Sequence, residues 1–261
     1  MLKLITGRVS NGAASVVYHA GGAGPAVCLL PSRGRGAGDL RALAAALVER
    51  GFRVLLPEPR GIGGSTGPYD GADFHDLAAD VAAVIAAETA EAERIIVAGH
   101  AFGHFIARTL AADIPDRLRG LVFLAAGGAT WADALTRATD LLGQPGVPRA
   151  DRLAALRLAF FAPGNDPEPW LDGWHADVAA GQSAARHRTD RETWWHGGTA
   201  PILDVIGRQD PFRAPDHHQD YAREFGGRVT LRFIDGASHA LPDERPTEAA
   251  DAIAAWARAL G

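Results

Sequence analysis

The pattern that most constrains the fold of this chain lies near its middle. A short apolar run over residues 94–98 is followed by Gly-His-Ala-Phe-Gly at 99–103, and a helical pattern covers 102–112. Two glycines around a tight turn let a strand and the next helix approach closely, because neither residue carries a Cβ. Ala101, between them, is then held in a strained conformation at the tip of the turn. The pattern predicts a strand–turn–helix unit that displays Ala101 at the end of a buried strand.

Apolar runs and helical patterns alternate along most of the chain. We expect strands at 3–9, 14–19, 26–30, 53–56, 94–98, 121–124, 202–206 and 230–234, and helices at 40–50, 74–87, 102–112 and 247–260. The dipeptide Asn11-Gly12 is typical of a hairpin turn between the first two strands. Such alternation predicts an α/β fold, with a mostly parallel, twisted sheet flanked by helices on both faces.

The alternation stops over residues 129–196. This segment has helical patterns at 131–142, 149–161 and 169–180, but no convincing strand. We therefore divide the chain into a core formed by 1–128 and 197–261 and a helical cap formed by 129–196. A helical insertion late in a parallel sheet is expected above the carboxyl ends of the strands, where open α/β folds bind ligands. Five of the six tryptophans lie in this segment, and they either line an apolar pocket or attach the cap to the core: Trp131, Trp170, Trp174, Trp194 and Trp195.

The composition argues against several classes of protein. Lys3 is the only lysine, whereas a phosphate-binding P-loop and a pyridoxal enzyme each need one in the site. The net charge of −5 offers no general attraction to nucleic acid or to an anionic membrane. Cys28 stands alone, and neither a secretion signal nor an apolar run of about 18 residues is present, so we expect a cytoplasmic protein. No cofactor is implied, and the oligomeric state is left open.

Two polar residues follow late strands, in positions where loops are expected. Asp210 comes after the apolar run 202–206, and His239 comes after 230–234. Because parallel strands end at the same edge of a sheet, we expect both side chains to lie near Ala101. A carboxylate orients a histidine and stabilises its imidazolium, and histidine exchanges a proton near neutral pH. The two residues are therefore candidates for an acid–base pair. His100 and His104 have helical spacing, but no third ligand is evident, and we expect no metal site.

The order of turn residue, acid and histidine resembles that of the α/β-hydrolase superfamily, and the resemblance covers nearly the whole chain. Gly-His-Ala-Phe-Gly is similar to the family's nucleophile elbow, Gly-x-Ser-x-Gly, with Ala101 at the position of the nucleophile. Residues 57–65 look like the loop that follows the family's fourth strand. The resemblance implies the α/β-hydrolase fold with a helical cap, and it implies catalytic positions at Ala101, Asp210 and His239.

Pro31-Ser32-Arg33-Gly34 occupies the place of the family's oxyanion loop, which usually reads His-Gly-x. The resemblance implies that the backbone N–H groups of Arg33 and Phe102 stabilise a developing oxyanion. We also expect Ser32, in this loop, at the substrate pocket, together with the tryptophans of the cap. The chain departs from the family pattern twice, with Pro-Ser in place of His-Gly and with alanine in place of the nucleophile.

The alanine is compatible with three interpretations. In the first, the chain is a serine hydrolase whose serine has been replaced, and its substrate is a small apolar ester or lactone. In the second, alanine is natural and the Asp210–His239 pair acts as a general base on water or on a carbon acid, as in a lyase, cyclase or isomerase. In the third, the protein binds a small ligand without catalysis. A branch of bacterial α/β-hydrolase-like proteins with a similar Gly-His-Ala-Phe-Gly favours a natural alanine. Each interpretation has a small-molecule substrate or ligand as the partner.

Overall fold

The computed structural model describes residues 2–260, which form one eight-stranded sheet with helices on both faces. The strand order is β1-β2-β4-β3-β5-β6-β7-β8; β1 and β2 pair antiparallel, as do β2 and β4, and all other neighbours are parallel. The strands are β1 Ile5–Asn11, β2 Ala14–Gly22, β3 Ala26–Leu30, β4 Arg53–Pro57, β5 Ile95–His100, β6 Leu118–Leu124, β7 Ile202–Gly207 and β8 Val229–Ile234. The predicted mostly parallel α/β sheet is confirmed.

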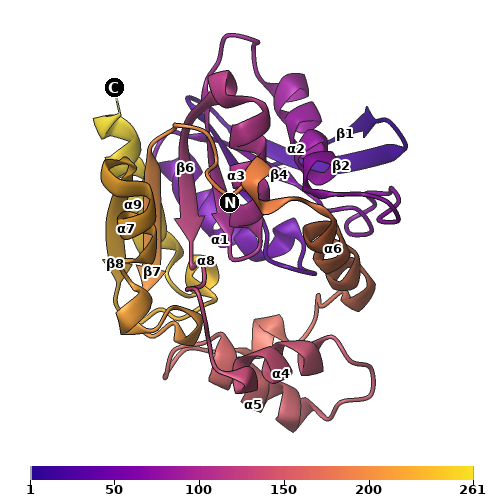
Figure 1. Ribbon diagram of the computed structural model, residues 1–261, viewed down its shortest axis with the longest axis vertical. Coiled ribbons are helices and arrows are strands. Elements are labelled where there is room, and N and C mark those ends of the chain that lie inside the picture. The colour runs from indigo at the N-terminus through magenta and orange to yellow at the C-terminus, as the bar shows by residue number, and fades with distance from the viewer. Residues whose placement is uncertain (1, 261) are drawn as a thin grey trace.

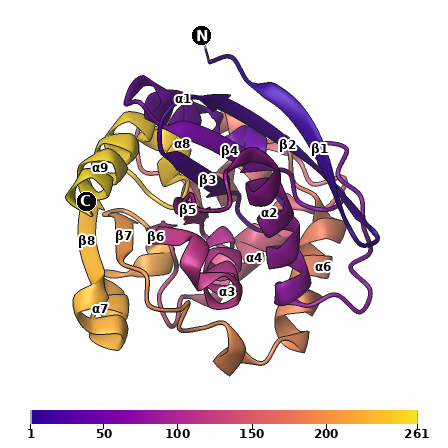
Figure 2. The same ribbon diagram turned by 90° about the horizontal axis from the view of Figure 1, so that it is seen from above.

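Helices cover the sheet in two layers. Figure 2 shows α1 and α9 on one face and α2 and α3 on the other. The helices are α1 Arg41–Glu49, α2 Phe74–Glu88, α3 Gly103–Asp113, α4 Asp133–Leu142, α5 Arg149–Ala159, α6 Ala176–Arg188, α7 Asp220–Phe225, α8 Leu241–Glu244 and α9 Pro246–Ala259. Within residues 2–260, no helix is long and apolar enough to cross a membrane.

The central strand β5 shows why these residues form a sheet buried on both sides. Successive side chains of a strand point to opposite faces. Ile95 and Val97 therefore pack in the core beneath α2 and α3, whereas Ile96 and Ala98 pack in the core beneath α1 and α9. A strand that meets apolar layers on both faces reads as a continuous apolar run, and β5 is buried along its whole length.

Residues 129–196 lie between β6 and β7 and contain α4, α5, α6 and short 3₁₀ turns, but no strand. Figure 1 shows α4 and α5 beyond the carboxyl end of β6, apart from the layers of the core. The predicted helix at 169–180 is wrong. The chain instead forms a 3₁₀ turn at Glu168–Trp170 and begins α6 at Ala176, because Gly173 between them has a φ of +81°, which no helix accepts.

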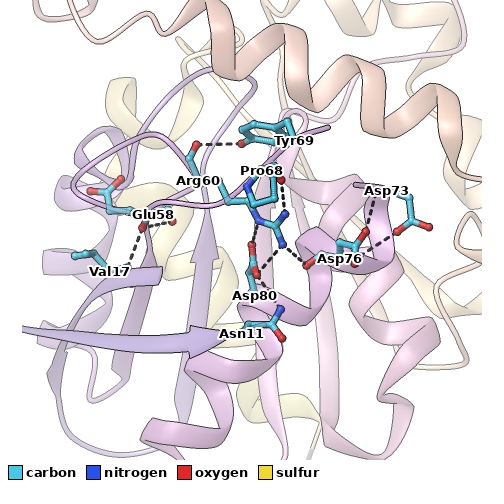
Figure 3. Close-up of polar contacts among 10 residues, drawn as sticks. Asn11, Val17, Glu58, Arg60, Pro68, Tyr69, Asp73, Asp76 and Asp80 are labelled. Atoms are coloured by element: carbon cyan, nitrogen blue, oxygen red, sulfur yellow. Dashed lines mark hydrogen bonds and ion pairs between the residues drawn. The ribbon is translucent and has the colours of Figure 1, made fainter. Parts of the chain in front are cut away.

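A buried ion pair anchors the loop that follows β4 (Figure 3). Arg60 donates to both carboxylate oxygens of Asp80 on α2, at 2.6 and 3.0 Å, and to the carbonyl of Pro68 at 2.6 Å. Asn11, at the end of β1, also donates to Asp80, at 2.9 Å. One carboxylate thus joins the hairpin, the loop and α2. The Tyr69 hydroxyl donates to the Arg60 carbonyl at 3.1 Å and closes the loop on itself.

We expect Asp80→Ala to lower the free energy of unfolding by about 3–5 kcal/mol, because it leaves the Arg60 guanidinium buried without its anion. Urea denaturation followed by tryptophan fluorescence measures the change. Asp251→Ala is the matched control, since it breaks a pair with Arg50 in which the carboxylate is solvent-exposed; it should cost far less, because water screens an exposed pair. Equal costs in the two variants would contradict the anchoring role of Asp80.

Candidate active site

The turn between β5 and α3 holds Ala101 in a strained conformation. Its φ is +44°, in the left-handed region that residues other than glycine rarely adopt. The glycines on either side are required by close contacts. A Cβ on Gly99 would lie 2.3 Å from the carbonyl carbon of Gly103, and a Cβ on Gly103 would lie 2.5 Å from the carbonyl oxygen of Leu30. The elbow geometry expected for residues 99–103 is therefore present, with a methyl group at its tip.

Backbone and side-chain bonds fix this turn in place. The Ala101 N–H donates to the carbonyl of Leu124, the last residue of β6, at 2.9 Å. The Ala101 carbonyl accepts from the N–H of His104 at 3.1 Å and from its ring Nδ1 at 2.5 Å. Burial lowers the pKa of His104 well below its usual value, and so its ring is a neutral donor here. The strained residue is thus held by both of its peptide groups.

Asp210 and His239 form a buried hydrogen-bonded pair. The Nδ1 atom of His239 lies 2.9 Å from Oδ2 of Asp210, and the other oxygen, Oδ1, accepts from the N–H of Phe212 at 2.9 Å. With Nδ1 held by Asp210, the nitrogen left for chemistry is Nε2. The ring packs beside Phe212 and Phe160, with centroid distances of 4.4 and 5.5 Å. The structure thus brings together the two residues that the sequence predicted as an acid–base pair.

His100 connects this pair to the elbow. It directly precedes Ala101, and its Nε2 donates to the backbone carbonyl of His239 at 2.7 Å. The two imidazole rings lie 5.8 Å apart. Burial, and then the neighbouring His239, lower the pKa of His100 to about 3, so His100 is neutral at ordinary pH. It therefore acts as a fixed donor that positions the loop of His239.

A half-buried carboxylate on α8 holds the same loop from the other side. The carboxylate of Glu244 accepts from the N–H of Ser238 at 2.6 Å, from the N–H of Ala162 at 2.7 Å and from the amide of Asn165 at 2.6 Å. Burial raises the pKa of Glu244, although these donors favour its charged form. The bonds tie the His239 loop to the segment that follows α5.

The loop after β3 lies where the resemblance placed an oxyanion loop. Its Gly34 N–H donates to the side chain of Gln182 on α6 at 2.8 Å, and its Gly34 carbonyl accepts from the N–H of His175 at 2.9 Å. Within residues 2–260, the N–H groups of Arg33 and Phe102 donate to no protein acceptor. Both backbone groups are thus available to an oxygen atom of a bound molecule.

A cavity of about 1350 Å³ opens at this edge of the sheet. It is lined by Ala101 and His239, and by Ser32, Arg33 and Phe102 of the two backbone-donor segments. Four of the five tryptophans that we expected in the pocket line it: Trp131, Trp174, Trp194 and Trp195.

Trp170, the fifth expected tryptophan, lies elsewhere. It is almost fully buried, packs edge-on to His100 at 6.0 Å and donates its indole N–H to Asp243 at 3.0 Å. The Arg35 guanidinium lies over both Trp170 and Trp174, 4.6 Å from each ring centroid. Trp170 therefore joins the inserted segment to the core behind the site. A pattern of tryptophans alone does not separate these two roles.

Other residues of the site were not singled out from the sequence. Phe160 and Phe212 flank His239 and line the cavity. A second histidine–carboxylate pair also lines the cavity, in which Nδ1 of His217 lies 2.8 Å from Oδ2 of Asp220. Phe212 follows Asp210 by only two residues, and this proximity in the sequence could have predicted that it lies at the site. Phe160 comes from a different segment, and nothing in the sequence predicts its place beside His239. Within residues 2–260, no group of three or more metal-ligating side chains is assembled.

The fold agrees with comparison to known proteins. A model of the alpha/beta hydrolase fold family matches residues 16–155, more than half of the chain. The chain belongs to this family. It is 27% identical to epoxide hydrolase A of Mycobacterium tuberculosis over 94% of both chains. It is also 35% identical to a putative carbamate hydrolase, RutD, of Azorhizobium caulinodans, over 49% of this chain and 46% of that protein.

Solved structures show the same fold. A thermophilic esterase from Thermogutta terrifontis superposes with a TM-score of 0.78 at 22% identity, over 100% of this chain and 99% of the esterase. A membrane phospholipase A, described as a bacterial virulence factor, gives a TM-score of 0.79 at 22% identity, over 98% of this chain and 86% of that one. At this level of identity the likeness concerns the fold alone.

The buried His100 makes the protein sensitive to acid. An unfolded histidine binds a proton below about pH 6.5, whereas folded His100 stays neutral down to about pH 3. Between these values the unfolded state binds more protons, so the free energy of unfolding falls as the pH falls. One such residue contributes up to about 1.4 kcal/mol per pH unit. Between pH 7.5 and pH 4.5, we expect the free energy of unfolding of His100→Gln to fall by about 2–3 kcal/mol less than that of the original protein.

Urea denaturation at the two pH values measures this difference. The free energy of unfolding of each variant is compared with its own value at pH 7.5, which removes the cost of the lost hydrogen bond from the comparison. His196→Gln, at an exposed position, is the matched control. An equal change in the two variants would show that His100 is not the source.

Proposed function

We propose that the protein hydrolyses a small ester, lactone or related acyl compound, with water rather than a side chain as the nucleophile. The observation that carries this proposal is the Asp210–His239 pair, kept intact at the wall of the cavity that Ala101 also lines. A protein that only binds a ligand has no need of an oriented, buried histidine–carboxylate pair. The pair supports acid–base catalysis, and the methyl group of Ala101 cannot form a covalent intermediate.

In the proposed reaction, Nε2 of His239 takes a proton from water, and the resulting hydroxide attacks the carbonyl carbon of the substrate. The backbone N–H groups of Arg33 and Phe102 stabilise the oxyanion that forms. His239, held by Asp210 in its proton-accepting orientation, then gives the proton to the leaving oxygen or nitrogen. The products are an acid and an alcohol or amine, and the side chains return to their starting state.

Several features of the site support this chemistry. A methyl group at the tip of the elbow leaves space next to His239 that a hydroxyl would otherwise take. Aromatic side chains around that space, including Phe105, Phe160 and Phe212, suit the apolar part of an acyl compound. The two curated relatives are named as hydrolases of an epoxide and, putatively, of a carbamate, and a carbamate has the carbonyl that this arrangement requires.

We also propose that residues 129–196 act as the cap of the site. Trp131, Trp174, Trp194 and Trp195 reach the cavity from this segment, and α6 binds the loop of Arg33 through Gln182. A cap in this position excludes bulk water from the oxyanion while it leaves a water molecule beside His239.

We expect His239→Ala to lower kcat on a responsive substrate by about 10²–10⁴-fold, because the general base is lost. A panel of aryl esters, lactones and carbamates provides the assay. Asp210→Asn should lower kcat in the same direction with little change in KM, since it removes only the orientation and charge of the pair. The exposed Asp235→Asn is the matched control. Ligand binding without turnover, unchanged in His239→Ala, would instead support a binding protein.

We expect Ala101→Ser to hydrolyse the same panel no faster than the original protein and to show no burst of product, because its hydroxyl takes the place of the attacking water. Stopped-flow measurement of the first turnover tests this directly. A burst, together with a rise of orders of magnitude in turnover, would overturn the water mechanism and identify an interrupted serine hydrolase.

A further inference from the structure

Four arginines line the cavity, and three of them lie beside an acidic side chain that also lines it. The pairs are Arg33 with Asp140 at 3.5 Å, Arg191 with Glu224 at 4.0 Å and Arg223 with Asp220 at 3.6 Å. The guanidinium of the fourth, Arg186, makes neither an ion pair nor a hydrogen bond with any residue of 2–260. The wall of the cavity therefore carries one positive charge that the protein does not balance.

Arg186 lies on the side of the cavity next to the elbow. Its guanidinium carbon is 4.8 Å from the centroid of the Phe105 ring, a contact in which a cation rests on an aromatic face. Phe105 stands one helical turn after Ala101, and its ring packs against that of Phe102 at 5.9 Å. The unbalanced charge thus rests on the first turn of α3, the helix that directly follows the elbow, and faces the cavity that Ala101 and Phe102 also line.

Arg33 approaches the same position from the opposite loop. Its guanidinium donates to the hydroxyl of Ser183 at 3.1 Å, and Ser183 precedes Arg186 by one turn of α6 and also lines the cavity. Burial, followed by the nearby charges of Arg191 and Arg33, lowers the pKa of Arg186. An arginine nevertheless remains charged at neutral pH. A bound anion would relieve the repulsion between these cations.

We propose that Arg186 binds a carboxylate of the substrate, so that the preferred substrate is a short acyl compound with a carboxylate near the reacting carbonyl. A half-ester of a small dicarboxylic acid has this form. The backbone N–H of Arg33 serves the carbonyl oxygen, while the side chains of Arg33 and Arg186 lie toward the carboxylate end. Only a few bonds then separate the two groups of the substrate. This inference rests on the proposed function for the identity of the reacting group.

Binding of an inert analogue tests the role of Arg186 without any turnover. The probes are 4-oxohexanoate, a ketone analogue of monomethyl succinate, and its neutral amide, 4-oxohexanamide, measured by titration calorimetry. We expect the protein to prefer the anion, and Arg186→Gln to weaken binding of the anion by about 10–100-fold with little effect on the amide. Arg186→Lys should restore part of the loss, since it keeps the charge but not the fork of donors.

Arg157→Gln is the matched control, because Arg157 is an exposed arginine on α5 that does not line the cavity. It removes the same net charge, and we expect it to leave the preference for the anion unchanged. Equal affinity for the two probes, an equal loss in both glutamine variants, or no binding of the anion would each overturn the inference.

Turnover of monomethyl and dimethyl succinate separates this inference from the proposed function. We expect a higher kcat/KM for the monoester, and Arg186→Gln should remove the difference between the two. Anion-selective binding that depends on Arg186, with neither ester hydrolysed, would contradict the proposed function and retain the carboxylate site. Hydrolysis of both esters at equal kcat/KM, without anion-selective binding, would contradict the carboxylate site alone.

Discussion

The close approach of β5 and α3 is the contact on which the site depends. Gly99 and Gly103 leave no space for a Cβ, and this contact forces the intervening Ala101 to a φ of +44°. Such strain persists only where the surroundings over-determine it. Here both peptide groups of Ala101 are bonded, to Leu124 and to His104. The chain therefore keeps the whole elbow, although the residue at its tip carries only a methyl group.

The other parts of the site are positioned by buried polar groups rather than by strain. His239 is held at Nδ1 by Asp210 and at its backbone carbonyl by His100, while Glu244 secures the preceding residue. His100, Asp210 and His239 are buried and Glu244 is half-buried. Away from water an unpaired polar atom is costly and a satisfied one is rigid. A histidine held in this way needs no reorganisation before it moves a proton, as the proposed catalysis with water as nucleophile requires.

Much of the fold followed from local patterns. Buried parallel strands appear as apolar runs, and β5 and β7 lie where such runs were found. The polar residues after β7 and β8 were predicted to meet because parallel strands end at one edge, and Asp210 does contact His239. The helices of the inserted segment were harder to predict from the sequence. Helix α6 begins later than its pattern suggested, after the bend at Gly173.

The sequence by itself determined the class of fold, the elbow with its alanine, and the pairing of Asp210 with His239, because each depends on residue type and on order along strands. Only the tertiary structure decided that Trp170 lies behind His100 rather than in the cavity, and that Phe160 flanks His239. It also revealed that Arg186 faces the cavity without an acidic partner among the described residues. Such facts depend on which distant segments meet, and local patterns carry no information about these contacts.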